Sequence, residues 1–128
     1  MSDLWTAALE AASDARYLAK DGRYRSACAR AYYAMFNVAR VLLAESQGTE
    51  AKKIKRHASI VRMFSLKFVR NGPFDARFGE ILRQASDLRV IADYDGEAIF
   101  ADDALAIIEA MDEFLAIAAS VRSKTRQS

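Results

Sequence analysis

The sequence contains one cysteine, one histidine and one proline in 128 residues. A single cysteine excludes an intramolecular disulfide and a cysteine-rich zinc site. With one proline and five glycines the chain has few helix breakers, so long helices can run without interruption. The sequence also lacks a glycine-rich phosphate loop, a Glu-x-x-His pair for a di-iron site and a second histidine for zinc. We therefore expect neither a metal nor a cofactor.

Strong charge and long apolar runs are missing as well. The formal net charge of +2 is too close to neutral to indicate nucleic-acid binding by itself. No apolar stretch approaches the ~18 residues that a membrane span requires. The N-terminal residues lack the basic start and apolar run of a secretory signal. We expect a cytoplasmic protein without a membrane partner.

What the sequence does contain is helical periodicity along its whole length. Apolar residues recur every three to four positions, which predicts five helices and no strand. The helices are expected at about residues 3–20, 23–46, 53–70, 75–93 and 102–122, with a frayed tail at 123–128. Asp21-Gly22 and Asn71-Gly72-Pro73 are the clearest breaks. The expected fold is all-α, with residues 1–128 in one domain: an up-and-down bundle of four long helices plus one additional helix.

The same periodicity predicts which side chains are buried. Cys28 lies among alanines and aromatic residues in helical phase, so we expect a small buried side chain. Tyr32 falls on the inward side of the same helix. The last helix is expected to bury the stripe of Leu105, Ile108, Met111, Leu115 and Ala118.

Two polar residues fall on apolar stripes, where they need an explanation. Arg89 lies in phase with Leu82, and Asp93 follows one turn later. A buried arginine is costly unless it is paired, so Arg89 and Asp93 form either an ion pair between helices or part of a ligand site. His57 also points inward, either as a core histidine or as an acid–base group at a cleft. The residues alone leave both alternatives open.

One aromatic residue falls on an outward arc instead. Tyr33 shares that arc with Arg30, Asn37 and Arg40. An aromatic side chain among polar groups suits a homodimer contact or the wall of a ligand site, although an incidental exposed tyrosine is equally compatible.

A basic run precedes His57 in the sequence. Its members are Lys52, Lys53, Lys55 and Arg56. Such a run can contact a phosphate backbone, or it can be a solvated helix surface.

These features together resemble the HEPN family (higher eukaryotes and prokaryotes nucleotide-binding), in its small stand-alone prokaryotic branch. The resemblance rests on Gly22-x-Tyr24, the segment Ala31-Tyr32-Tyr33-Ala34-Met35-Phe36, His57 before Phe64, and Arg89 with Asp93-Tyr94. It implies an all-helical bundle that often pairs as a homodimer. It also implies frequent partnership with a minimal nucleotidyltransferase as antitoxin in toxin–antitoxin operons.

Many members of this family are metal-independent ribonucleases, whose motif is an arginine followed four to six residues later by a histidine. Arg89 matches the arginine, but Asp93 and Tyr94 stand where the histidine is expected. Aspartate ionises near pH 4 and tyrosine near pH 10, so neither replaces imidazole easily at neutral pH. His57 could substitute only if it lies near Arg89 in space.

We therefore expect an RNA- or nucleotide-binding protein with a pocket of Arg89, Asp93, Tyr94 and His57. Tyr33, Asn37 and Arg40 are the expected ligand or dimer contacts. One alternative is a metal-independent endoribonuclease toxin, in which Arg89 stabilises the phosphate and His57 transfers a proton. The other is a non-catalytic helical interaction module.

Overall fold

The computed structural model describes residues 3–47, 57–70, 72–90 and 101–127, and every regular element in these ranges is helical. The elements are α1 (Asp3–Lys20), α2 (Tyr24–Gln47), α4 (His57–Phe64), the π-helical η1 (Ser65–Val69), α5 (Ala76–Val90) and α6 (Ala101–Gln127). The expected all-α fold is therefore confirmed.

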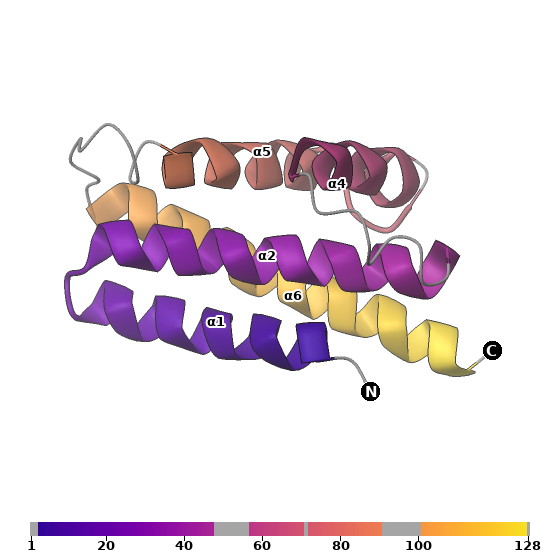
Figure 1. The fold of residues 1–128 in the computed structure, drawn as a ribbon, viewed down its shortest axis with the longest axis horizontal. Helices are drawn as coiled ribbons and strands as arrows, with labels where there is room; N and C mark the ends of the chain where they lie inside the picture. The colour runs from indigo at the N-terminus through magenta and orange to yellow at the C-terminus, as the bar shows by residue number, and fades with distance from the viewer. Residues whose placement is uncertain (1–2, 48–56, 71, 91–100, 128) are drawn as a thin grey trace.

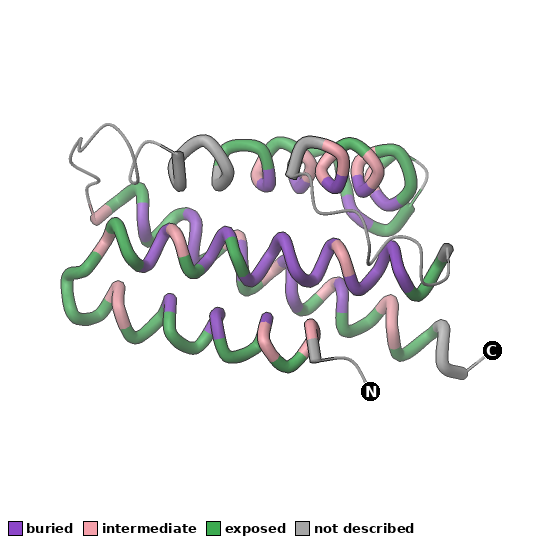
Figure 2. Tube along the Cα trace, viewed as in Figure 1, coloured by how far each residue is buried: buried purple, intermediate pink, exposed green. Residues whose placement is uncertain are grey.

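Helix α2 is the central element of the bundle. It packs against α1, α4, α5 and α6. Figure 1 shows α1 along one side of α2, α4 and α5 along the other, and α6 behind. Successive long helices run in opposite directions, as short connections favour. Because neighbours surround it, α2 is buried over most of its circumference (Figure 2).

The turn between α1 and α2 has the geometry that its sequence predicts. Gly22 adopts a φ of 78°, in the left-handed region that glycine enters without a steric penalty. The N–H of Arg23 donates to the carbonyl of Leu18 at 2.9 Å, and that of Gly22 donates to Ala19 at 3.1 Å. This pair of bonds is a Schellman motif, so Gly22 ends α1 where the sequence indicated.

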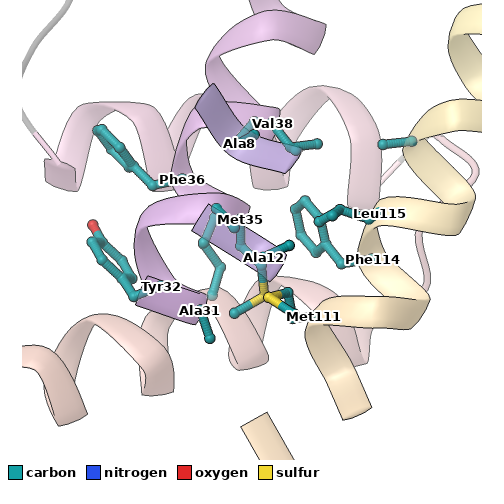
Figure 3. Packing of buried hydrophobic residues seen from close by; sticks show 14 of the residues in the cluster. Ala8, Ala12, Ala31, Tyr32, Met35, Phe36, Val38, Met111, Phe114 and Leu115 are labelled. Atoms are coloured by element: carbon teal, nitrogen blue, oxygen red, sulfur yellow. The ribbon is translucent and has the colours of Figure 1, made fainter. Parts of the chain in front are cut away.

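The core has two parts, one built from alanine side chains and the other from aromatic side chains. Small alanines of α1 and α2 let these helices approach closely, and a cluster of five phenylalanines fills the space between α4, α5 and α6: Phe64, Phe68, Phe74, Phe78 and Phe114. The rings of Phe64, Phe74 and Phe114 lie with centroids 5.0 to 5.2 Å apart. Figure 3 shows Met111, Phe114 and Leu115 of α6 directed toward α2. Cys28 is buried as predicted, and this burial, with a smaller contribution from the charge of Asp103, raises the pKa of its thiol to about 11.

The third expected helix, 53–70, differs from the structure in one respect. Residues 53–56 lie outside the described ranges, and the helix from His57 changes to π-helical geometry at Ser65. The N–H of Arg70 accordingly donates to the carbonyl of Ser65, five residues earlier. The chain then reverses through Gly72, where an added Cβ would lie 2.6 Å from the Phe68 carbonyl oxygen. Only glycine permits this close approach.

Helix α6 departs from prediction at both ends. Leu105 is exposed, so the prediction that it belongs to the buried stripe is wrong. The stripe is instead centred on Ala104, Met111 and Phe114, and Leu105 falls about 100° away from Ala104. At the other end the helix continues to Gln127 and thus includes residues 123–127, expected as a frayed tail.

The end of α6 is tied to two other helices through Arg122. Its Nε and Nη2 donate to the Glu45 carboxylate of α2 at 3.0 and 2.9 Å, and its guanidinium lies 4.3 Å from the Trp5 ring centroid of α1. These contacts hold the C-terminal part of α6 against α1 and α2. No helix among the described residues is long and apolar enough to cross a membrane.

Candidate functional site

Half of the predicted pocket and the whole predicted basic run lie outside the described residues. This applies to Asp93 and Tyr94 and to the basic run of Lys52, Lys53, Lys55 and Arg56. For His57 and Arg89 the structure describes the backbone and not the side chains. Whether the guanidinium and the imidazole share a recess therefore remains a prediction.

The backbone does place His57 and Arg89 in corresponding positions of one helical hairpin. His57 is the first residue of α4, and Arg89 is the last but one of α5. The two helices are joined through residues 70–75, and α5 packs on both α4 and η1. Both residues therefore lie at the helix ends remote from the connection. We call these ends the open end of the hairpin.

The predicted contacts on α2 are described in full and form a second polar feature. Arg30, Tyr33, Asn37 and Arg40 follow one side of the helix, and we call them the α2 arc. Tyr33 is 45% exposed, as expected, and the guanidinium carbon of Arg30 lies 5.4 Å from its ring centroid. Arg40 is partly buried and lies 5.9 Å from the Phe36 ring.

Asn37 is the unusual member of the α2 arc. It was expected on an outward side, but it is only 1% exposed, because α2 is the most enclosed helix of the bundle. Its Oδ1 accepts a long hydrogen bond of 3.5 Å from Arg40 Nη1, while its Nδ2 has no hydrogen-bond partner among the residues that the structure describes. A buried amide donor without a partner lowers the free energy of unfolding by about 1–3 kcal/mol, so packing alone does not favour asparagine at position 37.

The charge of the α2 arc has one sign. At 100° per residue, this side of α2 comprises Ser26, Ala29, Arg30, Tyr33, Asn37, Arg40 and Ala44. It therefore carries two arginines and no acid. Guanidinium groups bind phosphate and carboxylate, a tyrosine ring stacks on planar groups, and an amide hydrogen-bonds to base edges or peptide groups.

Two hollows among the described residues lie away from the α2 arc. A cavity of about 60 Å³ is lined by Leu42, Glu45, Ser46, Phe68, Val121 and Arg122, with room for one or two waters. A more open hollow of about 410 Å³ lies between Pro73 and the C-terminal part of α6. Neither includes a predicted site residue. The sequence did not predict that Phe68 and Arg122 line a cavity. The π-helical geometry of η1, which positions Phe68, leaves no periodic pattern in the sequence.

Comparison with known proteins identifies the class of this helical bundle. The profile of the HEPN domain family matches residues 1–121. The chain therefore belongs to the HEPN family, which confirms the resemblance carried by its tyrosine-rich segment and by Arg89.

Three relatives share this similarity. The chain is 36% identical over 103 residues to the Methanocaldococcus jannaschii protein named "Putative toxin MJ0605", a match covering 80% of this chain and 74% of that protein. It is 35% identical over 82 residues to "UPF0332 protein PH1297" of Pyrococcus horikoshii, covering 63% and 55%. It is 32% identical over 72 residues to "Putative toxin MJ0142" of M. jannaschii, covering 56% and 46%. The latter two matches span only about half of those relatives.

Proposed function

We propose that this chain is a cytoplasmic, toxin-type HEPN protein that binds RNA or a nucleotide at the open end of its α4–α5 hairpin. The observation that carries the proposal is the 36% identity, over 80% of the chain, to a relative named as a toxin. A homodimer and a nucleotidyltransferase-like antitoxin are the partners that the family suggests. Residues 1–128 would act as a single domain.

The hairpin supports this assignment through the type of residue at its open end. Arg89 supplies a guanidinium, which binds a phosphate group through two parallel hydrogen bonds. His57 adds an imidazole, a group that can donate or accept a proton. Asp93 and Tyr94 follow Arg89 in the sequence and complete the proposed pocket. Since no histidine follows Arg89, we propose binding as the primary activity.

The first test measures binding of a fluorescent single-stranded RNA by anisotropy at several salt concentrations. We expect Arg89→Ala to weaken binding roughly tenfold, because a charge-assisted phosphate contact is lost. Arg83→Ala is the matched control, since Arg83 is an exposed arginine of the same helix that pairs with Glu80. Absence of RNA and nucleotide binding by the unmodified protein would refute the proposal.

The same preparation tests endoribonuclease activity, which the names of two relatives favour because a toxin must damage a target. Cleavage of RNA in EDTA that is lost in both Arg89→Ala and His57→Ala would establish a metal-independent ribonuclease. Cleavage that survives both substitutions would exclude these residues as catalytic groups. If Arg89→Ala lowers thermal stability and leaves ligand binding intact, the non-catalytic interaction module becomes the better description.

A further inference from the structure

We infer that the α2 arc of Arg30, Tyr33, Asn37 and Arg40 is a contact surface for single-stranded RNA. The inference rests on the proposed function for its ligand class. It adds the residues that bind the strand and the chemistry that each one supplies.

Tyr33 provides the stacking platform. Its ring is 45% exposed, whereas the neighbouring aromatic side chains Tyr32 and Phe36 of the same helix are buried. The Arg30 guanidinium lies 5.4 Å from the ring centroid, so a cation and an aromatic surface stand side by side. This combination suits nucleic acid, because the ring stacks on a base while the arginine contacts a phosphate or the base itself.

Asn37 supplies a hydrogen-bond donor that the folded protein does not use. Its Nδ2 is buried and has no partner, and its Oδ1 holds Arg40 Nη1 only at 3.5 Å, the long limit of a hydrogen bond. Arg40 has a long flexible side chain at the margin of this site. A phosphate bound by the partly buried Arg40 guanidinium would lie next to Asn37, and its oxygens would be acceptors for Nδ2.

The spacing of the arc suits an extended strand. Arg30 and Arg40 are ten residues apart, which corresponds to about 15 Å along the helix axis. Tyr33 and Asn37 lie between them. A strand running along α2 would therefore meet the exposed Arg30 and Tyr33 first and the partly buried Arg40 further along, over a few nucleotides, with Asn37 buried beneath them.

The composition of this side of α2 disfavours a protein partner. Protein interfaces are built around apolar and aromatic anchors, but besides Tyr33 this side offers only the small apolar residues Ala29 and Ala44. A second copy docking through the same arc would place arginines against arginines, with no acid among the described residues on this side of α2. An anionic ligand with planar groups would pair with the arginines and stack on the Tyr33 ring.

The experiment compares Tyr33→Ala, Tyr33→Phe and Arg30→Gln with the unmodified full-length chain in the anisotropy assay. We expect Tyr33→Ala to weaken RNA binding roughly tenfold and Tyr33→Phe to retain it, because stacking needs the ring and not the hydroxyl. Arg30→Gln should reduce the slope of log affinity against log salt by about 0.7, the value for one phosphate contact on a single strand. Tyr17→Ala is the matched control, since Tyr17 is an exposed tyrosine of α1, outside the arc.

Three outcomes would overturn the inference. If the unmodified chain binds RNA and Tyr33→Ala binds equally well, the arc is not an RNA surface, while the proposed function stands. If the unmodified chain binds no RNA, the proposed function fails and the inference fails with it. If Tyr33→Ala instead converts a dimer to a monomer in sedimentation equilibrium without changing RNA affinity, the arc joins two copies of the chain. Thermal melts of each variant, expected to match the unmodified protein because Arg30 and Tyr33 are exposed, establish that folding is intact.

Discussion

Asn37 shows how a single side chain can be better suited to a ligand than to the fold around it. It lies in the most enclosed helix of the bundle, yet its amide nitrogen has no hydrogen-bond partner. A leucine of similar size would satisfy the packing without this cost. Residues that reduce stability in this way are common where a protein binds something, because stability and function compete for the same positions.

At this position we predict that Asn37→Leu raises the free energy of unfolding by about 1 kcal/mol, because it removes a buried donor without a partner. The same change should weaken RNA binding. Urea unfolding followed by circular dichroism measures the first effect, and anisotropy measures the second. Ser26→Leu is the control on the exposed part of the same side of α2, and it should change stability by less than about 0.5 kcal/mol. A loss of stability in Asn37→Leu would show that the native amide contributes more than its contacts indicate.

Among the elements, the reversal between η1 and α5 determines how the hairpin is arranged. The π-helical turn shifts the chain at Ser65, and the next residues return past Phe68 within close contact of its carbonyl. The N–H of Phe74 donates to that same carbonyl at 3.0 Å. The orientation of α5, and with it the position of Arg89, therefore depends on the small volume at residue 72.

For this element we predict that Gly72→Ala destabilises the protein by about 2 kcal/mol, because the new methyl group would meet backbone atoms of Phe68 at 2.6 to 2.8 Å. Thermal unfolding is the measurement. Gly79→Ala is the matched control, since its methyl group would meet chiefly the Ser65 hydroxyl, which can rotate away, and alanine favours the helix. Equal stability of the two variants would mean that the reversal relaxes more easily than its geometry suggests.

The elements also show what a sequence can and cannot predict. The limits of α1 agree with prediction because Gly22 provides a local signal that needs no tertiary information. The π-helical turn was missed because it depends on a bond five residues back, which leaves no mark in the apolar pattern. Asn37 was expected outside because phase alone does not reveal how many helices surround α2. The candidate pocket could not be derived for a related reason: the separation of His57 and Arg89 depends on how α4 crosses α5.

On the scale of the whole molecule, ion pairs join helices that are distant in sequence. Arg16 of α1 pairs with Asp112 of α6, Arg77 pairs with Glu113, and Arg122 pairs with Glu45. They differ in exposure: the Arg122 and Glu45 side chains are 11% and 37% exposed, against 48% and 46% for Arg16 and Asp112. Water screens the second pair more strongly, so the two pairs should contribute differently.

We predict a coupling energy of about 1 kcal/mol or more between Arg122 and Glu45, from a double-mutant cycle of Arg122→Gln and Glu45→Gln. The guanidinium is partly buried, bidentate and seated on Trp5, which favours a strong pair. The same cycle with Arg16→Gln and Asp112→Asn is the control and should give less than about 0.5 kcal/mol. Similar values for both pairs would show that burial does not govern these contacts.

The course of the chain also has a practical bearing on how the protein can be handled. Figure 1 shows that α1 begins and α6 ends at one end of the bundle, whereas α5 finishes at the other. A fluorophore or surface linkage attached at either terminus therefore sits far from the last turn of α5. Immobilised protein should consequently keep that turn accessible to a dissolved oligonucleotide.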